Sequence, residues 1–138
     1  MALEYTNKGA KNKTRILVYP ELSYRIAGLL YEVHNQLGRF CTERQYGDLF
    51  EQRLKENGFK YEREKELPMP GELNNKPASN KVDFYVENKI LIDFKVKKFI
   101  TKEDYFQMKR YLAASKAKLG FIVNFRNTYL KPKRVINL

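Results

Sequence analysis

The stretch "KVDFYVENKILIDFKVKK", residues 81–98, decides the fold of this chain. Apolar and polar residues alternate in two runs, at about 81–86 and 90–97, and this alternation predicts two half-buried strands. The intervening "ENK", residues 87–89, suits a short turn that joins antiparallel strands. We therefore predict a β-hairpin at the centre of the sequence.

The faces of this hairpin follow from the two-residue period of a strand. Placing the apolar faces of both strands on one side of the sheet pairs Phe84 with Ile92. Asp83 then lies opposite or diagonal to Asp93, and Lys95 shares a face with Asp93. The same alternation predicts one apolar face in the first strand, made of Val82, Phe84 and Val86.

Two facing carboxylates require a physical explanation, because like charges across a strand pair are destabilising. At ~4 Å they repel by ~1 kcal/mol in water and by more in a shielded site. A divalent cation removes this repulsion, and Mg²⁺ (or Mn²⁺) suits oxygen ligands. Lys95 would then position or deprotonate a water, or offset charge on a phosphate. The alternative is that Asp83, Asp93 and Lys95 line a solvated sheet face, with Lys95 paired to one aspartate.

The elements around the hairpin predict an α/β fold, in which helices pack on a central mixed sheet of about four to five strands. The predicted helices cover residues 21–37, 42–57 and about 102–115, and the further strands cover residues 59–67 (exposed or edge), 119–125 and about 133–138. Thr42 is a candidate N-cap, and Thr101 with Asp104 resembles a capping box. Residues 68–80 are rich in turn-forming residues and predict a long surface loop.

Length and composition favour one domain. The chain has 138 residues, of which 43% are hydrophobic and 14% aromatic, which excludes a disordered composition. We expect a single folded domain over residues 21–138, preceded by a basic segment over residues 1–20. That segment forms either a flexible basic arm or a disordered tail, and its cationic residues are Lys8, Lys11, Lys13 and Arg15.

Charge indicates the class of partner. Lys and Arg number 27 against 16 Asp and Glu, for a formal net charge of +11. Such an excess favours nucleic acid, in the first place DNA, although a soluble protein with lysine-covered faces is the alternative. The apolar runs are too short to span a membrane, and the start lacks the apolar segment of a signal peptide. With the single cysteine, Cys41, these features predict a reducing, cytoplasmic location.

The hairpin resembles the active-site hairpin of the PD-(D/E)XK nuclease superfamily, which has the restriction-endonuclease-like fold. Asp83 matches its first acid, and "DFK", residues 93–95, matches its second half, whereas Val82 stands in place of the proline.

Within that superfamily, the chain from about Leu22 to Ile136 is similar to the bacterial GxxExxY protein family. Glu43 and Tyr46 match E-x-x-Y, although Phe40 replaces the naming glycine. The segments that carry the similarity are "YEVHNQLG", "CTERQYGDLFEQRLKENGF", "DFYVENKILIDFK", "QMKRYLAASKAKLGFIVNF" and "KRVIN".

The resemblance implies a catalytic set that joins the hairpin to two helices. Asp83 and Asp93 would be the central metal ligands, Glu43 a third carboxylate that reaches the metal, and Lys95 the catalytic lysine. Gln107, with Tyr111 four residues later, would match the Q-x-x-x-Y pattern behind the site.

Several of these residues also have a plain structural interpretation. Glu43 lies where acidic residues favour the helix dipole, and Gln107 is placed to hydrogen-bond backbone. His34, the only histidine, borders an apolar face and is interpreted as a structural group, and Cys41 as an ordinary small residue.

The predicted activity is Mg²⁺-dependent hydrolysis of phosphodiester bonds in DNA or RNA, by a protein that pairs as a homodimer if it cuts both strands of a duplex. Two alternatives remain open, a non-catalytic nucleic-acid-binding module and a regulatory protein-interaction domain of the same fold. The predicted backbone-binding residues are Lys97, Lys98, Lys102, Lys109, Arg110, Lys131, Lys133 and Arg134.

Overall fold

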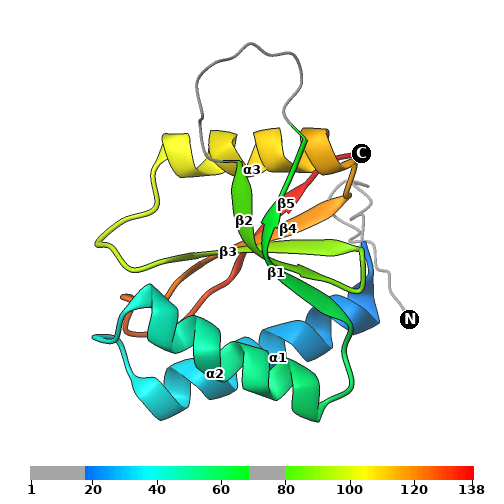
Figure 1. Cartoon of the computed structure of the whole chain (residues 1–138). Coiled ribbons are helices and arrows are strands. Elements are labelled where there is room, and N and C mark those ends of the chain that lie inside the picture. The colour runs from blue at the N-terminus through cyan, green and yellow to red at the C-terminus, as the bar shows by residue number, and fades with distance from the viewer. Residues whose placement is uncertain (1–17, 69–79) are drawn as a thin grey trace, which may run out of the picture.

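Three layers make up the described part of the chain, a five-stranded sheet with helices on both faces (Figure 1). The structure is a computed structural model that describes residues 18–68 and 80–138. The helices are α1 (Pro20–Leu37), α2 (Glu43–Glu56) and α3 (Lys102–Ser115), and the strands are β1 (Tyr61–Glu66), β2 (Lys81–Val86), β3 (Ile90–Lys95), β4 (Leu119–Asn124) and β5 (Lys133–Ile136). The predicted α/β fold with a mixed sheet is confirmed.

The sheet has the strand order β1-β2-β3-β4-β5. Neighbouring strands are antiparallel except β3 and β4, which run parallel and are joined by α3 as a crossover. Gly120 in β4 lies directly beneath Met108 of α3, where a Cβ atom would overlap the methionine sulfur. The missing side chain at this position therefore lets α3 pack close to the sheet.

Local signals place the helix ends where the sequence predicted them. Helix α1 ends at Gly38, whose φ of 79° is a left-handed value that glycine tolerates. The side chain of Thr42 accepts the backbone N–H of Gln45 in a capping box that starts α2. Thr101 and Asp104 form the corresponding capping box of α3, as predicted. These caps fix the starts of the two helices that border the hairpin.

Each face of the sheet has its own apolar core. On the α1–α2 side, Phe50 packs edge-on against Phe84, and Tyr46 stacks on Phe125 with ring centroids 4.1 Å apart. On the α3 side, the buried residues that pack together are Leu67, Val82, Leu91, Met108, Tyr111, Leu112, Ala117, Ile122 and Val135. The hairpin is thus covered on both faces.

The predicted apolar face of the first hairpin strand is wrong at Val82. Val82 packs with Leu91 on the α3 side, whereas Phe84 lies in the core beneath α1 and α2. The pairing of β1 with β2 passes over Glu64 and Asp83, and Glu64 has a left-handed φ of 54°. The alternation of faces breaks at this point, which a pattern of apolar residues cannot indicate.

Two predictions fall largely outside the described residues. The basic arm over residues 1–20 lies mostly in residues 1–17, and the loop over residues 68–80 lies mostly in residues 69–79. Both stay predictions, as does the domain boundary at residue 20. Within the described ranges, no helix is long and apolar enough to cross a membrane.

Candidate active site

The two hairpin acids meet where β2 and β3 separate. The predicted pair of Phe84 with Ile92 is confirmed, and it is the last pair of the ladder on the side toward Asp83. Beyond it, an Oδ atom of Asp83 accepts the backbone N–H of Phe94 at 2.6 Å. This bond holds the Asp83 carboxylate against β3, next to the strand position of Asp93.

The pKa of Asp83 indicates that the two carboxylates interact. Burial, and then repulsion from Asp93, raise the pKa of Asp83 to about 8 from its ordinary value of 3.8. The N–H of Phe94 opposes this rise in the pKa but does not cancel it. Asp93 itself is only 7% exposed, so solvent screens the pair weakly. Asp83 therefore resists carrying a negative charge beside Asp93 unless a further cation is bound.

Lys95 is held by three side chains at the edge of this pair. Its Nζ lies 3.0 Å from Asp93 Oδ2, 3.0 Å from Gln107 Oε1 and 3.7 Å from Asp104 Oδ1. Burial works against the charged form, but Asp93 and Asp104 outweigh it and raise the pKa of Lys95 above 10.5. Lys95 is therefore an ammonium group, suited to orienting a water or offsetting phosphate charge. The buried Asp93 also argues against a merely solvated sheet face.

Asp104 is a site residue that the sequence analysis used only as a helix cap. It is 8% exposed, closes the α3 capping box with Thr101, and lies 2.7 Å from the Nζ of Lys97. One carboxylate thus fixes the start of α3 and also holds two lysines of the β3 end. The capping-box pattern revealed its position, but nothing in the sequence linked it to Lys95.

Asn124, at the end of β4, is a second residue that the sequence analysis missed. Its side chain accepts the N–H of Lys97 at 3.1 Å and donates to the carbonyl of Lys97 at 2.7 Å. Its Oδ1 also accepts the N–H of Arg126 at 3.3 Å, and the side chain is buried. Asn124 therefore links the chain beyond β3 to the chain beyond β4.

Glu43 lies at the first position of α2, at the border of the site. Partial desolvation, and then the charge of Asp93, raise the pKa of Glu43, while Lys95 lowers it. Its carboxylate is thus within electrostatic range of the hairpin pair. Tyr46, one turn later, has a structural role, because its hydroxyl donates to the carbonyl of Gly38 at 2.6 Å and accepts the N–H of Cys41 at 3.2 Å.

The third helix supplies two further groups. Gln107 accepts a hydrogen bond from Lys95 rather than binding backbone, which supports the role that the resemblance implied. Tyr111 is 4% exposed, and burial followed by the charge of Asp93 raises its pKa to about 12.

His34, on α1, forms a hydrogen bond with the carbonyl of Asn127 at 2.9 Å, as expected of a structural histidine.

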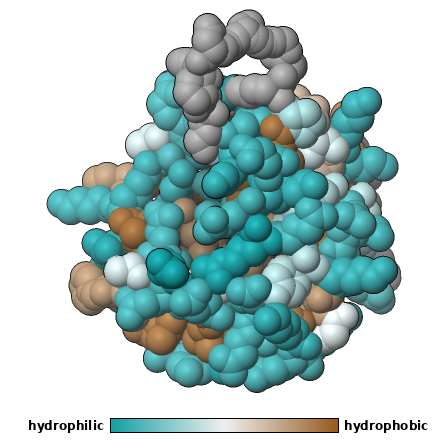
Figure 2. All heavy atoms as spheres, in the orientation of Figure 1, coloured by the Kyte–Doolittle hydropathy of each residue, from teal (hydrophilic) through white to brown (hydrophobic). Residues whose placement is uncertain are grey.

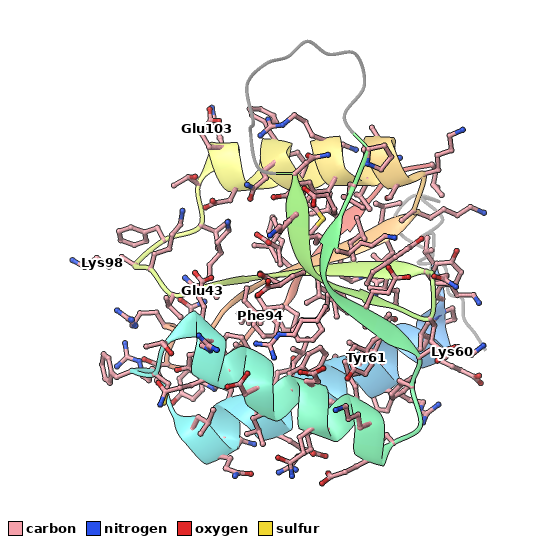
Figure 3. All side chains as sticks on the ribbon, viewed as in Figure 1. Glu43, Lys60, Tyr61, Phe94, Lys98 and Glu103 are labelled. Atoms are coloured by element: carbon pink, nitrogen blue, oxygen red, sulfur yellow. The ribbon has the colours of Figure 1, made fainter. Side chains whose placement is uncertain are left out.

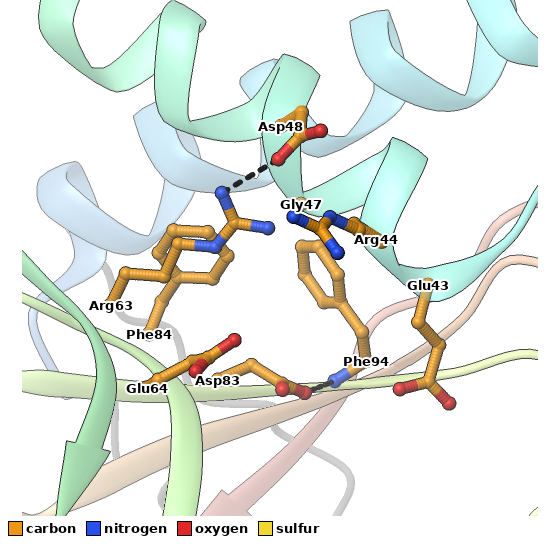
Figure 4. A pocket seen from close by; sticks show the side chains of 9 residues that line it. All are labelled: Glu43, Arg44, Gly47, Asp48, Arg63, Glu64, Asp83, Phe84 and Phe94. Atoms are coloured by element: carbon orange, nitrogen blue, oxygen red, sulfur yellow. Dashed lines mark hydrogen bonds and ion pairs between the residues drawn. The ribbon is translucent and has the colours of Figure 1, made fainter.

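A cleft of about 660 Å³ opens beside the acids, between α2 and the hairpin. Figure 4 shows the guanidinium groups of Arg44 and Arg63 on the α2 side, with the carboxylate of Asp83 across from them. Arg63 is paired with Asp48 at 2.9 Å. The described face around the cleft is largely hydrophilic (Figure 2). Acids and arginines on opposite walls suit a phosphate-bearing ligand with a bound cation.

The donor set fits a hard divalent cation. Asp83 and Asp93 offer carboxylate oxygens, and Glu43 lies in range as a third acid. Across residues 18–68 and 80–138, no group of three or more His, Cys, Asp or Glu is arranged to hold a metal. Mg²⁺ is usually held by one or two carboxylates together with substrate phosphates and water, which matches a two-acid site.

The predicted backbone-binding lysines and arginines divide into three groups. Lys97, Lys98 and Lys102 lie on the chain from the β3 end into α3, and Lys98 projects away from the body (Figure 3). Lys109 instead donates to the carbonyl of Ile136, and Arg134 to Ser23 Oγ on α1. The remaining three, Arg110, Lys131 and Lys133, are exposed. The first group thus lies on the chain that leaves the site, whereas Lys109 and Arg134 are held elsewhere.

The mixed sheet, with two acids and a lysine where its central hairpin opens, is a restriction-endonuclease-like α/β core. Residues 20–135 match the family model of the PD-(D/E)XK nuclease superfamily, and the chain belongs to that superfamily. The comparison with curated proteins gave no match, and neither did the comparison with solved structures. The narrower resemblance to the GxxExxY family stays a prediction.

Proposed function

We propose that this protein is a nuclease of the GxxExxY type that uses Mg²⁺ or Mn²⁺ to hydrolyse phosphodiester bonds of nucleic acid, in the first place DNA. The observation that carries the proposal is the pair of the half-buried Asp83 and the buried Asp93, with the Lys95 ammonium 3.0 Å from Asp93. Membership of the PD-(D/E)XK nuclease superfamily supports nuclease chemistry at this pair.

Asp83 and Asp93 are the residues that would hold the metal, and Glu43 would reach it directly or through a water. Once bound, a divalent ion supplies charge that polarises a phosphoryl oxygen and lowers the pKa of a bound water. The acids contribute fixed negative charge, and the N–H of Phe94 keeps the Asp83 carboxylate oriented before any ligand arrives. A site that is ordered in advance avoids reorganisation during the reaction.

Lys95 stabilises negative charge that develops on the phosphate. Gln107 and Asp104 fix its position from α3, and its raised pKa keeps it protonated at neutral pH. An ammonium group aimed at the reacting phosphate lowers the barrier most where water is excluded. The arginines of the cleft and the lysines beyond β3 bind the neighbouring phosphates of the backbone.

The test is cleavage of labelled single- and double-stranded DNA and RNA, with Mg²⁺, Mn²⁺ or EDTA. We expect cleavage only with metal, and its loss in Asp93→Asn. Glu103→Gln is the matched control, because Glu103 is an exposed carboxylate on α3 (Figure 3) and we expect it to leave the rate unchanged. Cleavage in EDTA, or none on any substrate, would refute the proposal.

The alternatives give different results in the same assays. A non-catalytic module binds nucleic acid in a salt-dependent way without turnover, so the unmodified protein and Asp93→Asn leave the strands equally intact. A regulatory domain in which the acids are structural binds DNA weakly and loses stability when Asp83 is replaced. Light scattering in the presence of duplex DNA tests the proposed pairing of two copies.

A further inference from the structure

An exposed aromatic ring stands beside the candidate active site, between two arginines. Phe40 lies in the turn between α1 and α2, three residues before Glu43, and is 74% exposed. The guanidinium carbon of Arg39 lies 4.9 Å from the ring centroid, and that of Arg126 lies 5.4 Å away. Both guanidinium groups lie over the ring, but at these distances they cover it only in part, because Phe40 stays 74% exposed and most of its apolar surface is open to a ligand.

Contacts between two loops hold the turn that carries this ring. Nε of Arg39 donates to the carbonyl of Arg126 at 2.9 Å, and Nε of Arg126 donates to the carbonyl of Arg39 at 2.9 Å. The hydroxyl of Tyr46 also stabilises this turn, because it donates a hydrogen bond to the carbonyl of Gly38 and accepts one from the N–H of Cys41. A surface that is ordered before binding loses little conformational entropy when a ligand arrives.

The loops around the ring are also connected, through Asn124, to the chain that follows the strand carrying Lys95. Asn124, whose Cα pairs with that of Lys95, binds the backbone of both Lys97 and Arg126. The turn before α2, the chain beyond β3 and the chain beyond β4 lie on the same side of the molecule (Figure 1). A second exposed phenylalanine, Phe99, is also 74% exposed and follows Lys98 in the chain beyond β3.

We propose that Phe40, with Arg39 and Arg126, is a stacking platform for an unpaired base, and that the substrate is single-stranded nucleic acid. Bases of a single strand offer free π faces, whereas bases inside a duplex are already stacked. Within the described residues, the side chain of each arginine hydrogen-bonds only through Nε, so its terminal nitrogens are open to phosphates on either side of the stacked base. That the bound strand is also cut rests on the proposed function. Binding of a base at the platform does not depend on that function.

The test measures binding of a labelled single strand and of its duplex by fluorescence anisotropy. The protein carries Asp93→Asn and is kept in EDTA, so that no strand is cut. We expect Phe40→Ala to weaken single-strand binding about 5- to 100-fold, the range of one base–aromatic stack. Phe40→Trp should restore it, and duplex binding should change less than about twofold because stacking is absent there.

Two further variants separate stacking from other effects. Phe40→Leu keeps an apolar side chain without a π face, and should bind single strands as weakly as Phe40→Ala with an unchanged melting temperature. Tyr24→Ala is the matched control, because Tyr24 is 81% exposed on α1 and lines a separate groove. The platform would be overturned if Phe40→Ala lost as much affinity for the duplex as for the single strand. It would also be overturned if Phe40→Ala and Phe40→Leu left the affinity for the single strand unchanged. Cleavage by the unmodified protein is scored separately, so the nuclease and the platform can fail independently.

Discussion

Asp83 is subject to two opposing interactions within one side chain. The N–H of Phe94 favours its ionised form, while burial and Asp93 favour the protonated form and raise its pKa to about 8. A carboxylate whose ionised form is unfavourable in the folded protein lowers the stability of the fold. Such groups are frequent at functional sites, where a bound ligand can compensate for the charge. At the residue scale, the raised pKa of Asp83 therefore supports the proposed metal site over an ordinary ion pair.

We expect Asp83→Asn to stabilise the metal-free protein. The folded-state pKa of Asp83 lies above its unfolded value, so its contribution to stability is fully present below about pH 4 and is lost as the pH rises through about 8. The amide cannot ionise and can still accept the N–H of Phe94. Each pKa unit corresponds to about 1.36 kcal/mol, and because Asp83 is partly exposed, solvent screening reduces the expected gain to about 1–3 kcal/mol above pH 8.

Urea unfolding in EDTA between pH 4 and pH 9 measures this gain. The difference between Asp83→Asn and the unmodified protein should be near zero at the acid end and grow as the pH rises. Asp48→Asn is a control, because it removes an exposed carboxylate that pairs with Arg63 and should lower stability slightly. A loss of stability in Asp83→Asn at pH 9 would instead favour the structural role of the acids.

The charge of Lys95 is the second prediction at this scale. We expect Lys95→Met to lower kcat about 10²- to 10³-fold with little change in KM, the usual effect of removing one group that stabilises transition-state charge. Because the pKa of Lys95 is raised, kcat should depend on pH in the same way in the variant and the unmodified protein up to pH 9. A pH-dependent rise in kcat that only the unmodified protein shows would mean that Lys95 acts as a base.

At the scale of elements, the hairpin shows what a sequence can predict and what it cannot. The register of Phe84 with Ile92 follows from burying apolar faces together, so the sequence determines it. Val82 is different, because the left-handed Glu64 on the neighbouring strand interrupts the pairing and turns the chain. That conformation depends on contacts between strands, and no local pattern around Glu64 reports it.

Asp104, at the start of α3, both closes the helix cap and pairs with Lys95 and Lys97. Thr101→Ala removes half of the capping box and should cost about 1 kcal/mol of unfolding free energy. Asp104→Asn keeps an acceptor for the cap but removes the charge that holds Lys95 and Lys97, and the lowered pKa of Asp104 shows that its ionised form stabilises the fold. We expect a similar loss of stability in both variants.

Activity should separate these two variants. Asp104→Asn frees one of the groups that position Lys95, so we expect its cleavage rate to fall about 10-fold, a typical loss for a residue that orients another. Thr101→Ala leaves the Asp104 charge in place and should keep its rate. Thermal unfolding and initial cleavage rates of the same preparations measure both effects, and equal rates in the two variants would mean that Asp104 acts only as a cap.

At the scale of the whole molecule, charge alone overstates the binding surface. The net charge of +11 indicated a polyanionic partner, but sequence reasoning could not tell which lysines stay free. Lys109 donates to the carbonyl of Ile136, which pairs with the start of β4, whereas Lys95 pairs with its end. Five residues of strand, roughly 16 Å, separate the two positions. The tertiary fold, rather than composition, selects the cations that can meet one strand of nucleic acid.

This selection predicts how salt affects binding. Each phosphate neutralised on a single strand contributes about −0.7 to the slope of log K against log salt concentration. Lys98 and Lys102 are exposed beside the site, so we expect the double variant Lys98→Ala/Lys102→Ala to make the slope shallower by about 1.4. Lys109→Met removes the same kind of charge far from the site and should leave the slope unchanged. Anisotropy titrations of the Asp93→Asn protein over a range of salt concentrations give all three slopes. Lys109→Met could instead reduce the slope by as much per removed charge as the double variant does. Binding would then depend on the net charge of the protein alone, and the nucleic acid would not bind along a defined surface beside the hairpin.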